Sequence, residues 1–160
     1  KVLNNGKPME WTTPSGWPMR VADRVPTKRK IETNLYGKKV SMTIADQPMD
    51  SPLSAAQANK SISANAIHSF DAAMAQLVVY RAAKQQLPIV SNHDCFACHP
   101  ANAGQLHELL VWEFGQLHRR RLLEEMREEI QERSGVQLKA PPNHGTLDPM
   151  AIGSNPYLFS

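Results

Sequence analysis

The stretch SNHDCFACHP, residues 91–100, admits two interpretations that predict different proteins. The first is the haem-attachment pattern C-x-x-C-H of c-type cytochromes, formed here by Cys95, Cys98 and His99. In the second, a short apolar strand ends just before His93 and Asp94, which form a turn, and a second short strand follows. This second interpretation places Asp94 at the tip of a strand-turn-strand, where its carboxylate can bind a metal ion.

The same stretch also contains four possible zinc ligands, namely His93, Cys95, Cys98 and His99. Four ligands within seven residues, partly alternating in direction along a strand, would close a tetrahedron poorly. The local spacing therefore leaves haem, zinc and a coincidental arrangement of cysteines open.

The composition is that of one globular domain. The chain has 160 residues, 41% of them hydrophobic, and only two cysteines, which are too few for a disulfide framework and favour a reducing compartment. It begins with Lys and shows neither a signal peptide nor a transmembrane stretch. We expect an intracellular fragment of a larger protein, with no membrane among its partners.

Positive charge is concentrated near the amino-terminal end. Residues 1–40 contain nine Lys or Arg and three acidic residues, a net charge of +6, whereas the whole chain carries +3. A basic end of this kind can face a polyanion, although a solvated basic surface fits the charge equally well.

Local patterns predict an α+β fold. Pro and Gly interleaved with Trp between residues 10 and 21 indicate extended, turn-punctuated chain, and alternation on both sides of Gly37 predicts a hairpin over residues 28–43. Residues 45–61 lack apolar periodicity and are expected to form a loop. Helical spacing predicts one helix from Asn65 to Pro88, a second over residues 102–134 ending at Gly135, and a loop-like tail.

Four separated motifs, in order along the chain, resemble the carboxy-terminal part of the single-subunit RNA polymerases of phages and mitochondria. They are W-x-T-P-x-G-x-P at 11–18, N-x-x-H-S-x-D at 65–71, H-D-[SC]-F at 93–96 and G-x-L-D at 145–148. An aromatic terminus follows, similar to the Phe-rich last residues of that family. In this interpretation C-x-x-C-H arises from two independent choices of small residues beside a strand.

The resemblance implies the carboxy-terminal palm and fingers portion of a right-hand polymerase, covering residues 1–160. Residues 1–60 would be an extended region with a DNA-facing hairpin, and residues 61–160 would hold palm-associated helices, the catalytic turn and the tail. The implied enzyme is a DNA-directed RNA polymerase that works by two-metal nucleotidyl transfer, with Asp94 as catalytic residue and ligand of Mg²⁺. Its other metal ligand and its nucleotide-binding residues would lie upstream, so the fragment alone is expected to be inactive.

The resemblance also implies nucleic-acid contacts, for which the candidate residues are His68, His93, Lys28, Arg29 and Lys30. His68 would contact the growing RNA end, His93 would orient Asp94 or touch a nucleic-acid backbone, and the hairpin would meet promoter DNA. The expected partners are double-stranded promoter DNA, the template strand, nascent RNA, nucleoside triphosphates and the upstream part of the polymerase. A structural role remains an alternative for each histidine, including a hydrogen bond between His68 and Asp71.

The resemblance favours the cytoplasm of a phage-infected bacterium over an organelle matrix. Two other classes of protein remain as alternatives. One is a c-type haem electron-transfer protein that uses Cys95, Cys98 and His99. The other is a non-catalytic nucleic-acid-binding remnant.

Overall fold

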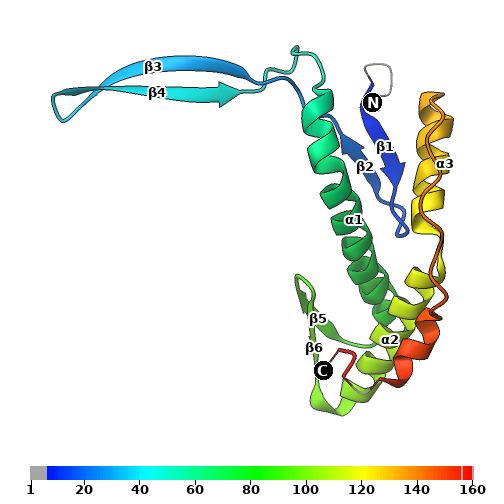
Figure 1. Cartoon of the computed structure of the whole chain (residues 1–160). Coiled ribbons are helices and arrows are strands. Elements are labelled where there is room, and N and C mark those ends of the chain that lie inside the picture. The colour runs from blue at the N-terminus through cyan, green and yellow to red at the C-terminus, as the bar shows by residue number, and fades with distance from the viewer. Residues whose placement is uncertain (1–6, 156, 160) are drawn as a thin grey trace.

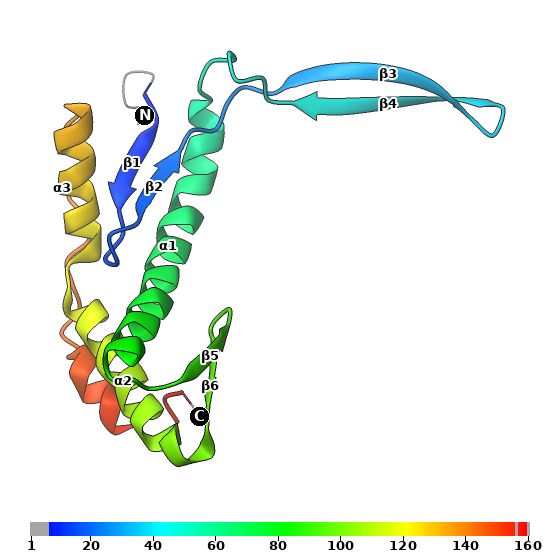
Figure 2. The ribbon, with the colours of Figure 1, turned by 180° about the vertical axis from the view of Figure 1, so that it is seen from behind.

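The computed structural model describes residues 7–155 and 157–159, and its strands form three separate two-stranded antiparallel sheets (Figure 1). The first pairs β1 (Met9–Thr12) with β2 (Pro18–Val21). This hairpin lies between the helices α1 (Ala55–Lys84) and α3 (Leu122–Ser134), a position that Figures 1 and 2 show from opposite sides. The turn-punctuated extended chain expected there is confirmed.

A long hairpin projects away from the rest of the chain (Figure 1). It consists of β3 (Thr27–Leu35) and β4 (Lys38–Asp46), in which every residue is exposed. Tyr36 and Gly37 form the two-residue turn with φ angles of 49° and 75°, the positive pair that a type I′ hairpin turn requires. The hairpin predicted around Gly37 is therefore confirmed.

The central helix α1 (Ala55–Lys84) begins ten residues before the predicted start. Ser54 caps it by accepting a hydrogen bond from the backbone N–H of Gln57 at 3.3 Å. Residues 55–61, expected to be part of a loop, are therefore helical. Their apolar face was not visible in the sequence because it consists of alanines such as Ala58, which is 4% exposed beneath the β1–β2 hairpin.

The single helix predicted over residues 102–134 is in fact two helices, α2 (Ala103–Arg119) and α3 (Leu122–Ser134). The chain is extended at Arg120, with φ −71° and ψ 150°. No Pro or Gly marks this break. The sequence analysis predicted one helix because the apolar residues keep helical spacing across it. The predicted stop at Gly135 is confirmed, and this residue has the left-handed φ of 69° typical of a helix carboxyl end.

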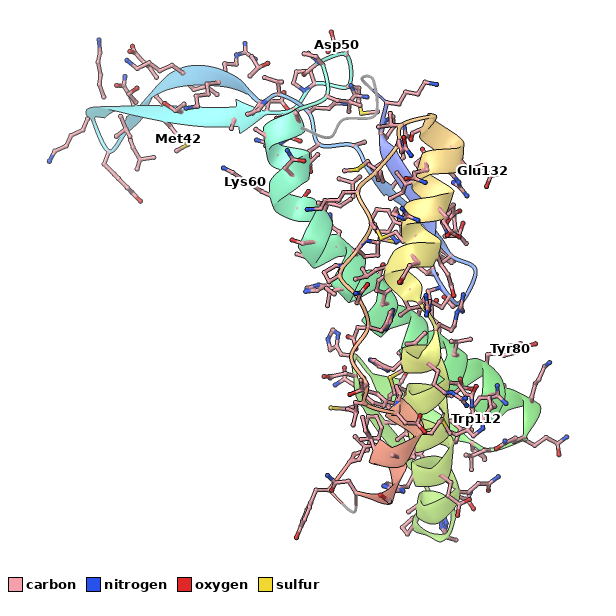
Figure 3. The ribbon with its side chains drawn as sticks, turned by 45° about the vertical axis from the view of Figure 1, so that its right-hand side comes forward. Met42, Asp50, Lys60, Tyr80, Trp112 and Glu132 are labelled. Carbon is pink, nitrogen blue, oxygen red and sulfur yellow. The ribbon has the colours of Figure 1, made fainter. Side chains whose placement is uncertain are left out.

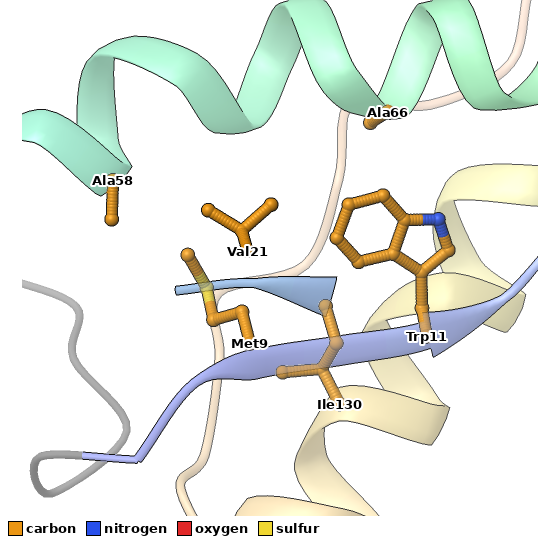
Figure 4. Packing of buried hydrophobic residues seen from close by; sticks show 6 residues of the cluster. All are labelled: Met9, Trp11, Val21, Ala58, Ala66 and Ile130. Atoms are coloured by element: carbon orange, nitrogen blue, oxygen red, sulfur yellow. The ribbon is translucent and has the colours of Figure 1, made fainter. Parts of the chain in front are cut away.

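Two buried clusters explain why the helix divides. Around Trp11, the first cluster joins the β1–β2 hairpin to α1 and α3, and Figure 4 shows Ile130 and Ala66 approaching it from the two helices. Residues of α1, α2 and the segment that follows α1 form the second: Val78, Ala82, Leu87, Leu106, Leu109 and Leu110. α3 contributes residues to the first cluster and α2 to the second. The bend at Arg120 therefore allows each of the two helices to bury its apolar face in its own cluster.

The remaining short elements flank α2. They are β5 (Ile89–Asn92), β6 (Cys95–Cys98) and two 3₁₀ helices, η1 (Pro100–Asn102) and η2 (Pro149–Ser154). Helices and antiparallel hairpins together give the expected α+β class. Within the described residues, no helix has the length and apolar character needed to cross a membrane.

Candidate active site

The predicted strand-turn-strand around Asp94 is present. β5 and β6 pair antiparallel with Asn92 opposite Cys95, so His93 and Asp94 form a two-residue turn. His93 has a positive φ of 56°, whereas the φ of Asp94 is negative. His is one of the non-glycine residues that adopt left-handed backbone most often, and two-residue hairpin turns require a positive φ at their first position.

Buried side chains fix this turn relative to the helices. Three residues of the hairpin pack against the second buried cluster, which lies between α1 and α2. They are Ile89 of β5 together with Phe96 and Cys98 of β6. The tip is therefore free of the core while its base is anchored on it. Asp94 is exposed, and in the described chain its carboxylate accepts one hydrogen bond, a long one from Cys95 Sγ to Oδ1 at 3.7 Å. Most lone pairs of the carboxylate are thus available to a ligand.

A cavity of about 680 Å³ brings residues from four parts of the chain together. It is lined by Asp71, Ala72, Met74 and Ala75 of α1, His93, Asp94 and Phe96 of the β5–β6 hairpin, Phe114 of α2, and Phe159 of the tail. Both views of the ribbon place the tail beside β5 and β6 (Figures 1 and 2). The sequence predicted the hairpin residues, whereas Asp71 and Phe159 were noted as parts of motifs without a place in the site.

The other predicted nucleic-acid-binding residues lie outside the cavity wall. His68 is exposed on α1, three positions before Asp71, and no hydrogen bond joins these two residues in the described structure. The proposed structural role for His68 through Asp71 is therefore not observed. The projecting β3–β4 hairpin carries Lys28, Arg29 and Lys30. It leaves the molecule near the amino-terminal end of α1, whereas the β5–β6 hairpin lies near the carboxyl end of that helix (Figure 1).

The strand geometry argues against a common ligand for the two cysteines. Cys95 and Cys98 are three positions apart on β6, so their side chains point to opposite faces of the ribbon, about 10 Å apart along it. Cys98 packs against the core, whereas Cys95 is exposed beside Asp94. His99 has a local role as well, since its Nδ1 accepts the backbone N–H of Ala101 at 3.2 Å. The haem interpretation is not supported, and the described residues contain no group of three or more His, Cys, Asp or Glu able to hold a metal.

The cavity offers hard oxygen ligands for Mg²⁺ from Asp94 of the β5–β6 turn and from Asp71 of α1. Mg²⁺ commonly uses one or two carboxylates and completes its octahedron with water and substrate phosphates. The donor set therefore suits Mg²⁺ in chemical type. The described chain by itself does not form a complete metal centre.

Comparison with known proteins identifies the family. Residues 1–145 match the profile of the DNA-dependent RNA polymerases. The chain belongs to this family. The predicted resemblance to single-subunit RNA polymerases is thus confirmed, and the motif around Asp94 falls within the matched region.

Individual relatives agree with this assignment. The mitochondrial DNA-directed RNA polymerase of Mus musculus is 28% identical over 179 residues, covering 99% of this chain and 15% of that polymerase. Polymerase 2B, chloroplastic/mitochondrial, of Nicotiana tabacum is 24% identical over 160 residues, with the same coverage. Polymerase 1A of Nicotiana tabacum is 23% identical and is covered over 99% of its length. This chain therefore spans about 15% of the first two relatives.

These relatives correct the predicted location. The sequence analysis favoured the cytoplasm of a phage-infected bacterium, but the polymerases of mouse and tobacco that match are named as mitochondrial and chloroplastic enzymes. That expectation is wrong. The sequence analysis assigned the motifs to phage and mitochondrial polymerases together, so the motifs gave no basis for that choice.

Proposed function

We propose that this chain is the carboxy-terminal palm and fingers portion of a single-subunit RNA polymerase, and that Asp94 binds Mg²⁺ for DNA-templated RNA synthesis. The observation that supports this most strongly is the position of Asp94 on the two-residue turn between β5 and β6, at the wall of a cavity, within a chain of the RNA polymerase family. The matching relatives favour a polymerase of an organelle.

Nucleotidyl transfer explains why an exposed carboxylate belongs at this place. Bound Mg²⁺ lowers the pKa of the attacking 3′-hydroxyl and stabilises the leaving pyrophosphate. Asp94 supplies negative charge and hard oxygen atoms at the edge of a cavity large enough for part of a nucleotide. The anchored base of the β5–β6 hairpin fixes the backbone of the turn that carries Asp94, which limits the reorganisation needed during each addition.

The substrates would be nucleoside triphosphates and the growing RNA end, paired with a template strand. His93 borders the same cavity as Asp94, and we assign it to orienting the carboxylate or contacting the nucleic-acid backbone. His68, exposed on α1, is assigned to the RNA end. The remaining metal ligand and the groups that bind the incoming nucleotide would come from the upstream part of the polymerase.

Promoter DNA is the proposed partner of the β3–β4 hairpin. Lys28 and Lys30 lie on one face of β3 and Arg29 on the other, as the strand alternation requires. All three are exposed on a ribbon that projects from the rest of the described chain (Figure 1). Such side chains suit contacts with phosphates, which provide affinity without sequence choice.

The test of Asp94 is its replacement in the complete polymerase. Asp94→Asn keeps the size of the side chain and removes the charge, so RNA synthesis should fall by about three orders of magnitude or more while DNA binding changes little. Asp50→Asn makes the same chemical change at an exposed loop position away from the cavity and should be close to normal. Elongation by the Asp94 variant at the rate of the Asp50 control would refute the proposal.

A further inference from the structure

The tail of the chain is fitted closely onto α2. η2 lies against this helix where Gly115 leaves room for Met150, and a Cβ atom at Gly115 would collide with the sulfur of Met150. A Cβ atom at Gly153 would in turn lie 2.7 Å from Cγ1 of Val111. The two glycines, one on α2 and one on η2, therefore leave space that the side chains of Met150 and Val111 occupy.

A histidine of α2 joins this helix to the last described residues. Nε2 of His107 lies 2.9 Å from the backbone carbonyl oxygen of Leu158, across 51 residues of sequence. A carbonyl oxygen can only accept, so Nε2 must carry the proton and donate. The ring is partly buried, and the neutral Nε2–H tautomer and the charged imidazolium both make this bond.

The residue after Leu158 is Phe159, which borders the Asp94 cavity. Its ring stands edge-on to Phe114 of α2 with centroids 5.7 Å apart. Its backbone has a φ of 59°, an unfavourable left-handed conformation for a Phe. Two described contacts hold this segment in place, namely the packing of Phe159 against Phe114 and the His107 hydrogen bond one residue away.

We propose that His107 is a positioning residue for the active site. By donating to the Leu158 carbonyl, it keeps Phe159 against Phe114 and so fixes the part of the cavity wall that these two rings form. The kinetic part of this inference rests on the proposed polymerase function. The structural part, that His107 holds the tail, does not depend on activity.

The test compares two replacements in the complete polymerase. His107→Phe keeps an aromatic ring and removes the donor, whereas His107→Gln places an amide N–H at similar reach and should restore the bond. Hydrogen exchange of the backbone amides of residues 149–159 reports the docking of the tail. We expect exchange to be about fivefold faster in the Phe variant, equivalent to one hydrogen bond of about 1 kcal/mol, and near normal in the Gln variant.

Steady-state kinetics provide the second readout. In the Phe variant kcat for nucleotide addition should fall about threefold to tenfold with a smaller change in DNA affinity, and the Gln variant should recover it. Gln105→Phe, an equally apolar change at an exposed position of α2, is the matched control and should alter neither readout. Combining His107→Phe with Phe159→Ala should cost no more than Phe159→Ala alone, because both act through the same side chain.

The outcomes separate the two proposals. Unchanged exchange of the tail in His107→Phe would overturn the positioning role, whatever the activity of the enzyme. Additive losses in the double variant would also overturn it, because His107 would then act independently of Phe159. Faster exchange together with a fully active Asp94→Asn enzyme would support the anchor while refuting the proposed catalytic site.

Discussion

Trp11 in β1 donates a hydrogen bond from its indole Nε1–H to Ser69 Oγ in α1 at 3.2 Å, across 58 residues of sequence. Ser69 in turn donates to the carbonyl oxygen of Ala66 at 2.7 Å. Trp11 is completely buried and Ser69 is 4% exposed. Two motifs that the sequence presents separately, around Trp11 and around Ser69, are therefore in direct contact and hold the first hairpin on the helix that carries Asp71.

Replacing Trp11 should loosen this contact. Trp11→Phe keeps an aromatic ring but removes the indole donor and leaves unfilled space, so we expect a loss of about 2–3 kcal/mol in the free energy of unfolding. Urea denaturation of the polymerase, followed by a probe in this region, measures the loss. Trp17→Phe is the control, because Trp17 is 62% exposed and should change stability by less than about 0.5 kcal/mol. Equal midpoints for the two variants would contradict the assigned role.

A second pair joins α1 to α2 near the end of α1. Arg81 forms an ion pair with Glu113, and its guanidinium lies 3.7 Å from the centroid of the Trp112 ring. Figure 3 shows Trp112 at the same end of the molecule as Tyr80 of α1. Glu113 is 3% exposed, so its charge depends on the arginine for compensation.

Removing the arginine should therefore cost more than removing both charges. Arg81→Met leaves Glu113 buried without a partner, and because the Arg81 side chain is 42% exposed we expect a loss of about 2 kcal/mol rather than the full cost of a buried pair. The double variant Arg81→Met, Glu113→Leu should recover to within about 1 kcal/mol of the natural protein. A double variant no more stable than Arg81→Met in urea denaturation would contradict this expectation, because the loss would then not come from leaving Glu113 buried without a partner.

A third contact makes stability depend on pH. The carboxylate of Glu129 in α3 accepts the backbone N–H and the hydroxyl of Thr12, both at 2.6 Å, and pairs with Arg133 at 2.5 Å. Partial burial by itself raises the pKa of Glu129, but the hydrogen bonds from Thr12 and the charge of Arg133 outweigh it and hold the pKa below the ordinary 4.5. The ionised form is thus favoured in the folded state.

A lowered pKa in the folded protein gives stability that is present above the unfolded value and disappears as the pH falls through the folded one. Glu129→Gln should therefore cost about 1–2 kcal/mol near pH 7 and progressively less below the ordinary pKa of 4.5. Urea denaturation at pH 7 and pH 3 tests this, with the exposed Glu132→Gln as control. A cost that grows toward low pH would have the wrong sign.

The sequence predicted the elements whose signals are local. Gly37 and its alternating neighbours identified the long hairpin, because a type I′ turn restricts which residues fit. The turn at Asp94 was identified by two short apolar runs around polar residues. In both cases the residues that determine the hairpin lie within a few positions of its turn.

Features that depend on distant contacts were missed. The early start of α1 is decided by alanines that become apolar contacts only when the β1–β2 hairpin covers them, as Ala58 does. The break at Arg120 has no sequence marker, because it results from α2 and α3 joining different clusters. Asp71 and Phe159 line the same cavity although they are far apart in sequence, and no local sequence pattern predicts this proximity.

The projecting β3–β4 hairpin can be tested through the salt dependence of DNA binding. Lys28 and Lys30 lie on the same face of β3 and are exposed, and Lys30 is also 3.6 Å from Glu32, an exposed ion pair of little energetic value. If both lysines contact phosphates, their replacement by Ala should weaken promoter binding across sequences and reduce the slope of log K against log salt by roughly two, about 0.9 for each contact. If one of them contacts a guanine edge, the loss should depend on the base at one promoter position and cost about 1–3 kcal/mol there.

Replacing Lys60 and Lys139, exposed lysines outside the hairpin, removes the same charge and should leave the slope nearly unchanged. Salt titrations on matched and mismatched promoters with the complete polymerase distinguish these outcomes, and a slope unchanged by the Lys28 and Lys30 replacements would mean that the hairpin is a solvated basic surface.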